Sequence, residues 1–152
     1  MKGRAYIFLR KDGAAIPGGF AGHVGWGFSL GADGPFYAGS TENPSGMPVV
    51  LPGGDNGWWG AEFPSEAAMI EAFGARQYDG FKWATVREPN LGAARAVAEH
   101  QQVEGYTGLR NNCLDHAYKI LRAYGVDDLP WLQNHPAPSD WFAAFNGEYK
   151  NL

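Results

Sequence analysis

A hairpin pattern in the first third of the chain constrains the fold more than any other feature. Residues 22–30 are rich in aromatic and apolar residues interrupted by glycine, and Asp33-Gly34 follows as a typical two-residue turn. Residues 36–42 then have the composition of a returning strand. We therefore predict an antiparallel pair of strands in which Ala32 faces Pro35.

Strand alternation divides the side chains of this pair between two faces. With a two-residue turn, His23, Ser40 and Glu42 share one face, and Glu42 lies diagonally from His23. Small glycines surround His23 on that face, which leaves room for a substrate or another element. Trp26 lies on the opposite face, which we expect to be core. A three-residue turn would invert the faces and bring two other residues beside the histidine, Tyr37 and Thr41.

The rest of the chain predicts an α+β fold in a single domain, residues 1–152. Strands are expected at 6–9 and 81–86, and residues 43–64, rich in glycine and proline, read as an irregular loop. Ser65 and Asn112 are good N-caps for helices, a further helix starts at Pro89 or Asn90, and Gly125 ends the helix after Asn112. A short helix is expected in the tail after residue 130.

Composition narrows the classes of function. The chain has 152 residues, 45% hydrophobic and 18% charged, with a net charge of -4. This charge gives no attraction to nucleic acid or to an anionic membrane surface, and no apolar run is long enough to cross a bilayer. A single cysteine allows no internal disulfide, and no signal-peptide pattern is present. We expect a cytoplasmic protein, or one exported without a signal peptide.

Cys113, the single cysteine, stands at the predicted start of the helix after Asn112. Free peptide N–H groups and the helix dipole at this position favour a thiolate, which is the reactive form of cysteine. His23 is the candidate base, and Glu42 or, less favourably, Ser40 would orient its ring.

Other roles for these residue types remain open. His116, one turn after Cys113, is a rival base, but it lies too close on the helix to leave space for a substrate. Cys113 and His116 alone are a weak metal signal, so we expect no metal and no cofactor. Asn112 is either the helix cap or an oxyanion ligand.

Aromatic residues supply the candidate substrate contacts. Trp58 and Trp59 lie in the Gly- and Pro-rich segment and are expected to form one wall of the cleft. Trp26, although assigned to the core face of its strand, is kept as a third candidate contact.

The motifs His23-Val24-Gly25 and Asn112-Cys113-Leu114-Asp115-His116 resemble those of the permuted papain-like superfamily. This group includes NlpC-type peptidases, PPPDE peptidases and lecithin:retinol acyltransferase-like enzymes, in which the strand histidine precedes the cysteine. The resemblance implies a permuted papain-like fold, with a small antiparallel sheet packed against the helix that carries the nucleophile. The second histidine usual in the acyltransferase-like members is absent here, which argues against a lipid acyltransferase.

The residues together predict a cysteine peptidase or amidase in which Cys113 and His23 cleave an amide or isopeptide bond. Cell-wall peptides and ubiquitin-like conjugates are both compatible substrates. One alternative is a binding or interaction module on the same fold. Another is a small structural or immunity-type protein, for which Cys113 would be buried and inert.

Overall fold

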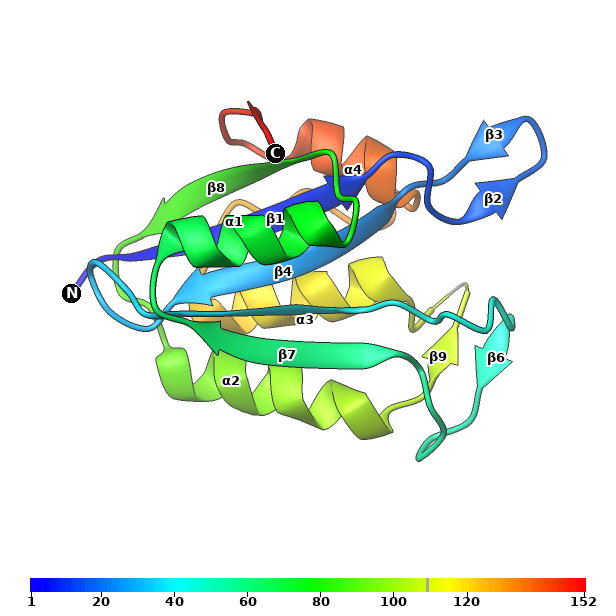
Figure 1. The fold of residues 1–152 in the computed structure, drawn as a ribbon, viewed down its shortest axis with the longest axis horizontal. Helices are drawn as coiled ribbons and strands as arrows, with labels where there is room; N and C mark the ends of the chain where they lie inside the picture. Colours follow the sequence, from blue (N-terminus) through cyan, green and yellow to red (C-terminus); the bar gives the residue numbers. More distant parts are fainter. Residues whose placement is uncertain (109) are drawn as a thin grey trace.

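The computed structural model describes residues 1–108 and 110–152. They form an α+β fold built on an antiparallel sheet whose strands differ in length (Figure 1). Its strand order, among the described residues, is β10-β8-β1-β4-β5-β7. The strands are β1 (Gly3–Arg10), β4 (His23–Ser29), β5 (Phe36–Thr41), β7 (Trp58–Phe63), β8 (Gly80–Val86) and β10 (Lys150–Asn151). Two short pairs lie outside this sheet: β2 (Ala15–Ile16) with β3 (Gly19–Phe20), and β6 (Val49–Val50) with β9 (Tyr106–Thr107).

Helices cover both faces of the sheet. On one face, α1 (Glu66–Ala75) packs Met69 and Phe73 onto aromatic side chains of β1, β5 and β8. On the other face lie α2 (Leu91–His100), the short 3-10 turn Gln101–Val103, α3 (Cys113–Tyr124) and α4 (Pro138–Ala144). Because β1 is covered from both sides, its residues Ala5 to Leu9 form a continuous buried run. Among the described helices, none has the length and apolarity needed to cross a bilayer.

The predicted helix starts are confirmed by their caps. Ser65 accepts a hydrogen bond from the backbone of Ala68, and Asn90 accepts one from Ala93. Gly125 ends α3 in a left-handed conformation, as a residue without a Cβ does readily.

The hairpin register differs by two residues from the predicted one. Gly27 pairs with Ala38, and the connection closes through a hydrogen bond from Leu30 N–H to the carbonyl of Pro35, 2.7 Å long. A two-residue turn would have needed an N–H at Pro35 to close onto Ala32, and proline has none. A shift of two residues leaves the alternation unchanged, so the predicted division of side chains between the faces is retained.

The segment expected to be irregular contains an edge strand. Residues Trp58–Phe63 pair with β5, from Thr41 opposite Trp58 to Phe36 opposite Phe63. The glycines and prolines of the preceding residues hid this strand from the sequence analysis. Its aromatic residues are typical of a half-buried edge strand. The glycines next to His23 also have a structural use, because the ring of Phe73 from α1 packs against Gly25.

Gly39 lies at a tightly packed point of the sheet, which the addition of one methyl group can test. A Cβ there would collide with the carbonyl oxygen of Trp59 and lie 2.8 Å from the ring of Trp26. We expect Gly39→Ala to lower the free energy of unfolding by about 2–3 kcal/mol, because backbone atoms cannot move aside cheaply. Chemical denaturation would measure this change.

The matched control is Gly74→Ala in α1, where a Cβ would meet nothing within 4 Å. It is expected to raise the free energy of unfolding by about 0.5–1 kcal/mol, since alanine favours a helix. Equal effects at the two positions would contradict the described packing of β5 against β7.

Candidate functional site: a histidine between a thiol and a carboxylate

His23, Ser40 and Glu42 come together on one face at the end of the β4–β5 pair. His23 Nε2 lies 2.8 Å from Ser40 Oγ and 2.9 Å from Glu42 Oε2. Ser40 Oγ is also 3.0 Å from the hydroxyl of Tyr78 and donates to the carbonyl of Val24. The ring orientation of His23 is therefore set through Nε2, which leaves Nδ1 for another partner.

Glu42 is held by donors from three other parts of the chain. Its Oε1 accepts hydrogen bonds from Trp59 Nε1 at 3.0 Å and from the Tyr78 hydroxyl at 3.1 Å. Its Oε2 accepts one from Arg10 Nη2 at 2.9 Å, in addition to the contact with His23. A carboxylate with these partners has little rotational freedom and can direct the imidazole.

Cys113 is the first residue of α3, and its thiol is close enough to His23 for each group to shift the pKa of the other. The backbone N–H of Val24, the next residue of β4, also donates to its sulfur. Two residues of one strand and the N-terminus of one helix thus surround the thiol. Each of these contacts stabilises the thiolate over the thiol.

The pKa values follow from these contacts. Burial lowers the pKa of His23, but the Cys113 thiolate and Glu42 outweigh burial and raise it to about 9. Burial raises the pKa of Cys113, and the positive charge and hydrogen bond of His23 bring it below its usual value. Burial also raises the pKa of Glu42, but the hydrogen bond and charge of His23 lower it to about 2. These shifts favour the thiolate–imidazolium pair over the neutral thiol and imidazole, and they keep Glu42 ionised around neutral pH.

A cleft of about 470 Å³ opens beside these residues, and both His23 and Glu42 line it. Cys113 itself is only 4% exposed and His23 5% exposed. Tyr106 also lines the cleft, and its hydroxyl contacts the backbone N–H of Cys113. Tyr106 therefore lies where the cleft meets the N-terminus of α3.

Asn112 serves as the cap of α3. Its side-chain oxygen accepts from the backbone N–H groups of Leu114 and Asp115, while Asp115 accepts from the backbone of Asn112. Its side-chain amide donates to the carbonyl of Gly108. With both ends of its side chain occupied, Asn112 holds the helix start in place, and the geometry favours the capping role over oxyanion binding.

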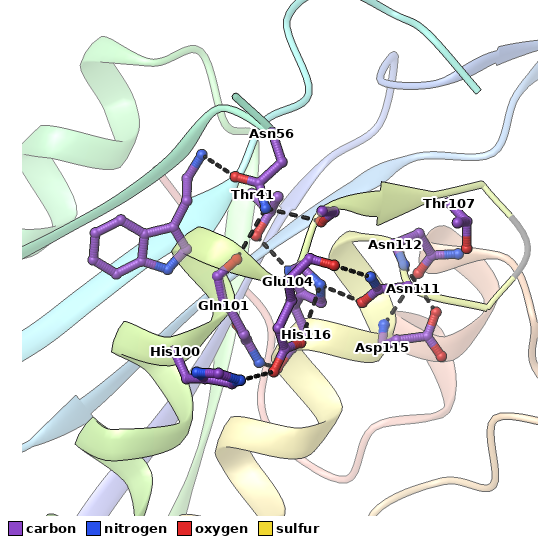
Figure 2. Close-up of polar contacts among 12 residues, drawn as sticks. Thr41, Asn56, His100, Gln101, Glu104, Thr107, Asn111, Asn112, Asp115 and His116 are labelled. Carbon is purple, nitrogen blue, oxygen red and sulfur yellow. Dashed lines mark hydrogen bonds and ion pairs between the residues drawn. The ribbon is translucent and has the colours of Figure 1, made fainter. Parts of the chain in front are cut away.

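His116, in the first turn of α3, is buried in a separate polar network, shown in Figure 2. Its Nδ1 lies 2.6 Å from Thr41 Oγ1, and its Nε2 lies 2.6 Å from Asn111 Oδ1. Asn111 donates its own amide to the carbonyl of Glu104, so its oxygen faces the ring. Burial, with a smaller contribution from the charge of Lys119, lowers the pKa of His116 to about 4.

This network has a structural use. A neutral ring accepting from Thr41 and donating to Asn111 connects the first turn of α3 to the end of β5 (Figure 2). Gln101 adds to the connection, since its side chain donates to the carbonyl of His116. The network thus fixes α3, and with it Cys113, against the strands that carry the other site residues.

The tryptophans expected to contact substrate do not line the cleft. Trp26 is fully buried in the core, so the expectation that it touches a substrate is wrong. Trp59 donates its indole N–H to Glu42 and packs against Phe73. Trp58 packs onto the core on the α3 side of the sheet. Because β7 is a strand, the two adjacent tryptophans pack against the cores on opposite faces of the sheet, and neither side chain is available to form a wall of the cleft.

Three residues of the site were not predicted in their roles. Arg10 lies opposite His23 in the β1–β4 register, which a single sequence does not reveal. Tyr78 follows α1 without any local motif, and Tyr106 lies in a strand of two residues. Among the described residues no group of three or more His, Cys, Asp or Glu side chains is arranged to hold a metal ion.

Glu42→Gln tests the electrostatic coupling within the site. The amide keeps the shape of the side chain but removes the charge that helps to raise the pKa of His23, so this pKa is expected to fall. The imidazole resonances of His23, followed by NMR through a pH titration, would measure the change. Glu62→Gln, on the neighbouring edge strand and bound to Arg95, is the control and should leave the titration of His23 unchanged.

The chain matches no protein-family model, no curated protein and no solved structure at a significant level. What the site does must therefore be inferred from its own geometry.

Proposed function

We propose that this protein is a cysteine-dependent hydrolase that cleaves an amide or isopeptide bond, with Cys113 as nucleophile and His23 as acid and base. The observation that supports this most directly is that His23 lies between the thiol of Cys113 and the carboxylate of Glu42. A nucleophile, a base and a group that orients the base are the minimum needed for covalent acyl transfer.

The proposed reaction has two steps. The Cys113 thiolate attacks the carbonyl carbon to form a C–S bond, and the His23 imidazolium gives its proton to the departing nitrogen as the C–N bond breaks. His23, now neutral, then takes a proton from water, which attacks the thioester, releases the acid and restores the thiolate. Glu42 stabilises the imidazolium and fixes the ring throughout.

The developing oxyanion is expected to bind the backbone N–H of Cys113 at the N-terminus of α3. This N–H contacts the Tyr106 hydroxyl, so a substrate carbonyl would have to share or take the place of that contact. Burial and the charge of Cys113 raise the pKa of Tyr106, and its hydroxyl therefore keeps a proton that it can donate to an oxyanion.

The combination of a strand histidine, a helix-start cysteine and an antiparallel sheet also supports a permuted papain-like fold as part of the proposal. The order of the two residues in the chain, with His23 first, fits that arrangement. The resemblance extends over β4, β5 and α3, and the substrate range within the superfamily is left to experiment.

A structural protein without turnover, in which Cys113 is inert, is the second candidate, and the low exposure of Cys113 favours it. A covered thiol in contact with a strand can serve packing alone. Thiol reactivity separates the two functions, because a covered structural thiol labels slowly or not at all.

Alkylation of Cys113 by iodoacetamide is expected to stay fast near pH 6, where an ordinary thiol is almost fully protonated and slow. The rate should decrease only as the pH falls through the lowered pKa of Cys113. His23→Ala should slow the reaction at pH 6 by about tenfold or more, because it removes the positive charge that stabilises the thiolate. Mass spectrometry of the intact protein would follow the rate.

The matched control is His100→Gln, which removes an exposed imidazole of α2. His100 contacts Glu104 and neither Cys113 nor Glu42, so this variant should alkylate at the rate of the unsubstituted protein. A labelling rate that follows a thiol titrating near pH 8.5 would refute the hydrolase and support a binding module. A thiol that does not label would refute the hydrolase and support a structural protein.

A further inference from the structure

Two projecting strand pairs stand on either side of the cleft beside His23. Figure 1 shows β2–β3 and β6–β9 at the same end of the molecule, the end at which β4 and α3 begin. The cleft is lined by Ala14 and Ala15 from the first side and by Gly46, Met47 and Pro48 from the second. A molecule bound beside His23 would therefore contact both sides.

Phe20 gives the first side an exposed aromatic ring. It pairs with Ala15 across β2–β3, and cross-strand partners point to the same face of a ladder. Because Ala15 lines the cleft, we infer from this pairing that Phe20, which is 54% exposed, is on the cleft side of the strand pair, next to the residues that line the cleft. Ile16, paired with Gly19, lies on the opposite face with a similar exposure of 50%.

On the second side of the cleft, Met47 is the exposed apolar side chain that corresponds to Phe20. It lines the cleft and is 56% exposed. Nearby, Val50 pairs with Tyr106, which also lines the cleft, so the adjacent Val49 points away from it. Val49 is 53% exposed. Each side thus offers one large apolar side chain toward the cleft and one of similar exposure away from it.

The charge of the cleft restricts what can bind there. Among its described lining residues, Arg10, Glu42 and the imidazolium of His23 are the charged ones, and Glu42 lies 2.9 Å from each of the other two. The remaining lining is small, apolar or neutral, which suits the close approach of a peptide backbone. A substrate selected by a carboxylate or an ammonium group would find no free partner among these residues.

We propose that the substrate is an extended polypeptide with an apolar side chain on each side of the bond that is cleaved, one seated on Phe20 and the other on Met47. This inference rests on the proposed function, because it places the cleaved bond at Cys113. It favours unfolded or flexible protein segments over small amides and over acidic cell-wall peptides.

The test uses three covalent probes that share an epoxysuccinyl core, with a short peptide attached on both sides. The peptides contain leucine, serine or glutamate at the residues next to the core. Opening of the epoxide by the Cys113 thiolate forms a C–S bond, breaks a C–O bond and leaves an alkoxide that takes up a proton. The rate of mass gain, divided by the iodoacetamide rate of the same protein, reports recognition apart from thiol reactivity.

The leucine probe is expected to react about tenfold faster than the serine and glutamate probes, since each buried apolar side chain contributes a gain of this order. Phe20→Ser and Met47→Ser should each reduce the rate of the leucine probe by about tenfold and leave the iodoacetamide rate unchanged. The matched controls Ile16→Ser and Val49→Ser, which alter the outward faces of the same strand pairs, should retain the preference for leucine.

Equal rates for the three probes, or equal losses in Phe20→Ser and Ile16→Ser, would overturn this inference while fast iodoacetamide labelling leaves the proposed function intact. A Cys113 that reacts with neither the probes nor iodoacetamide would overturn both.

Discussion

The arrangement of the site depends on the partly buried carboxylate of Glu42. It lies just past the end of β5 and gathers hydrogen bonds from Trp59, Tyr78 and Arg10, besides its contact with His23. A carboxylate partly removed from water is costly unless such donors surround it, so the surrounding strands and Tyr78 must be in place before it is stable. The orientation of His23 is thus a product of the whole sheet.

The thiol is positioned by a different part of the structure. Asn112 and Asp115 close the first turn of α3 by mutual capping, and His116 connects the same turn to Thr41 at the end of β5. Two independent sets of polar contacts, one for the imidazole and one for the helix start, therefore converge on the end of the β4–β5 pair. Reactive groups held by rigid elements in this way lose little freedom when a substrate binds.

The local signals of the sequence predicted more of the site than of its surroundings. Alternation placed His23, Ser40 and Glu42 on one face, and this division survived a register shift because the shift was an even number of residues. The donors to Glu42 depend on which strands are neighbours, and nothing local in the sequence specifies that β1 lies beside β4 or β7 beside β5. Trp59 shows the limit: its position near the site was expected, but its role changed once β7 proved to be a strand.

Because His116 is buried, the stability of the fold depends on pH. Its pKa of about 4 in the folded chain lies below the value of about 6.5 expected once the chain unfolds. The unfolded state therefore gains a proton first as the pH falls, and stability declines from about pH 6.5 downward, by about 3 kcal/mol at pH 4. A mildly acidic compartment would loosen the attachment of α3 to the sheet while the charge of Glu42 is still retained.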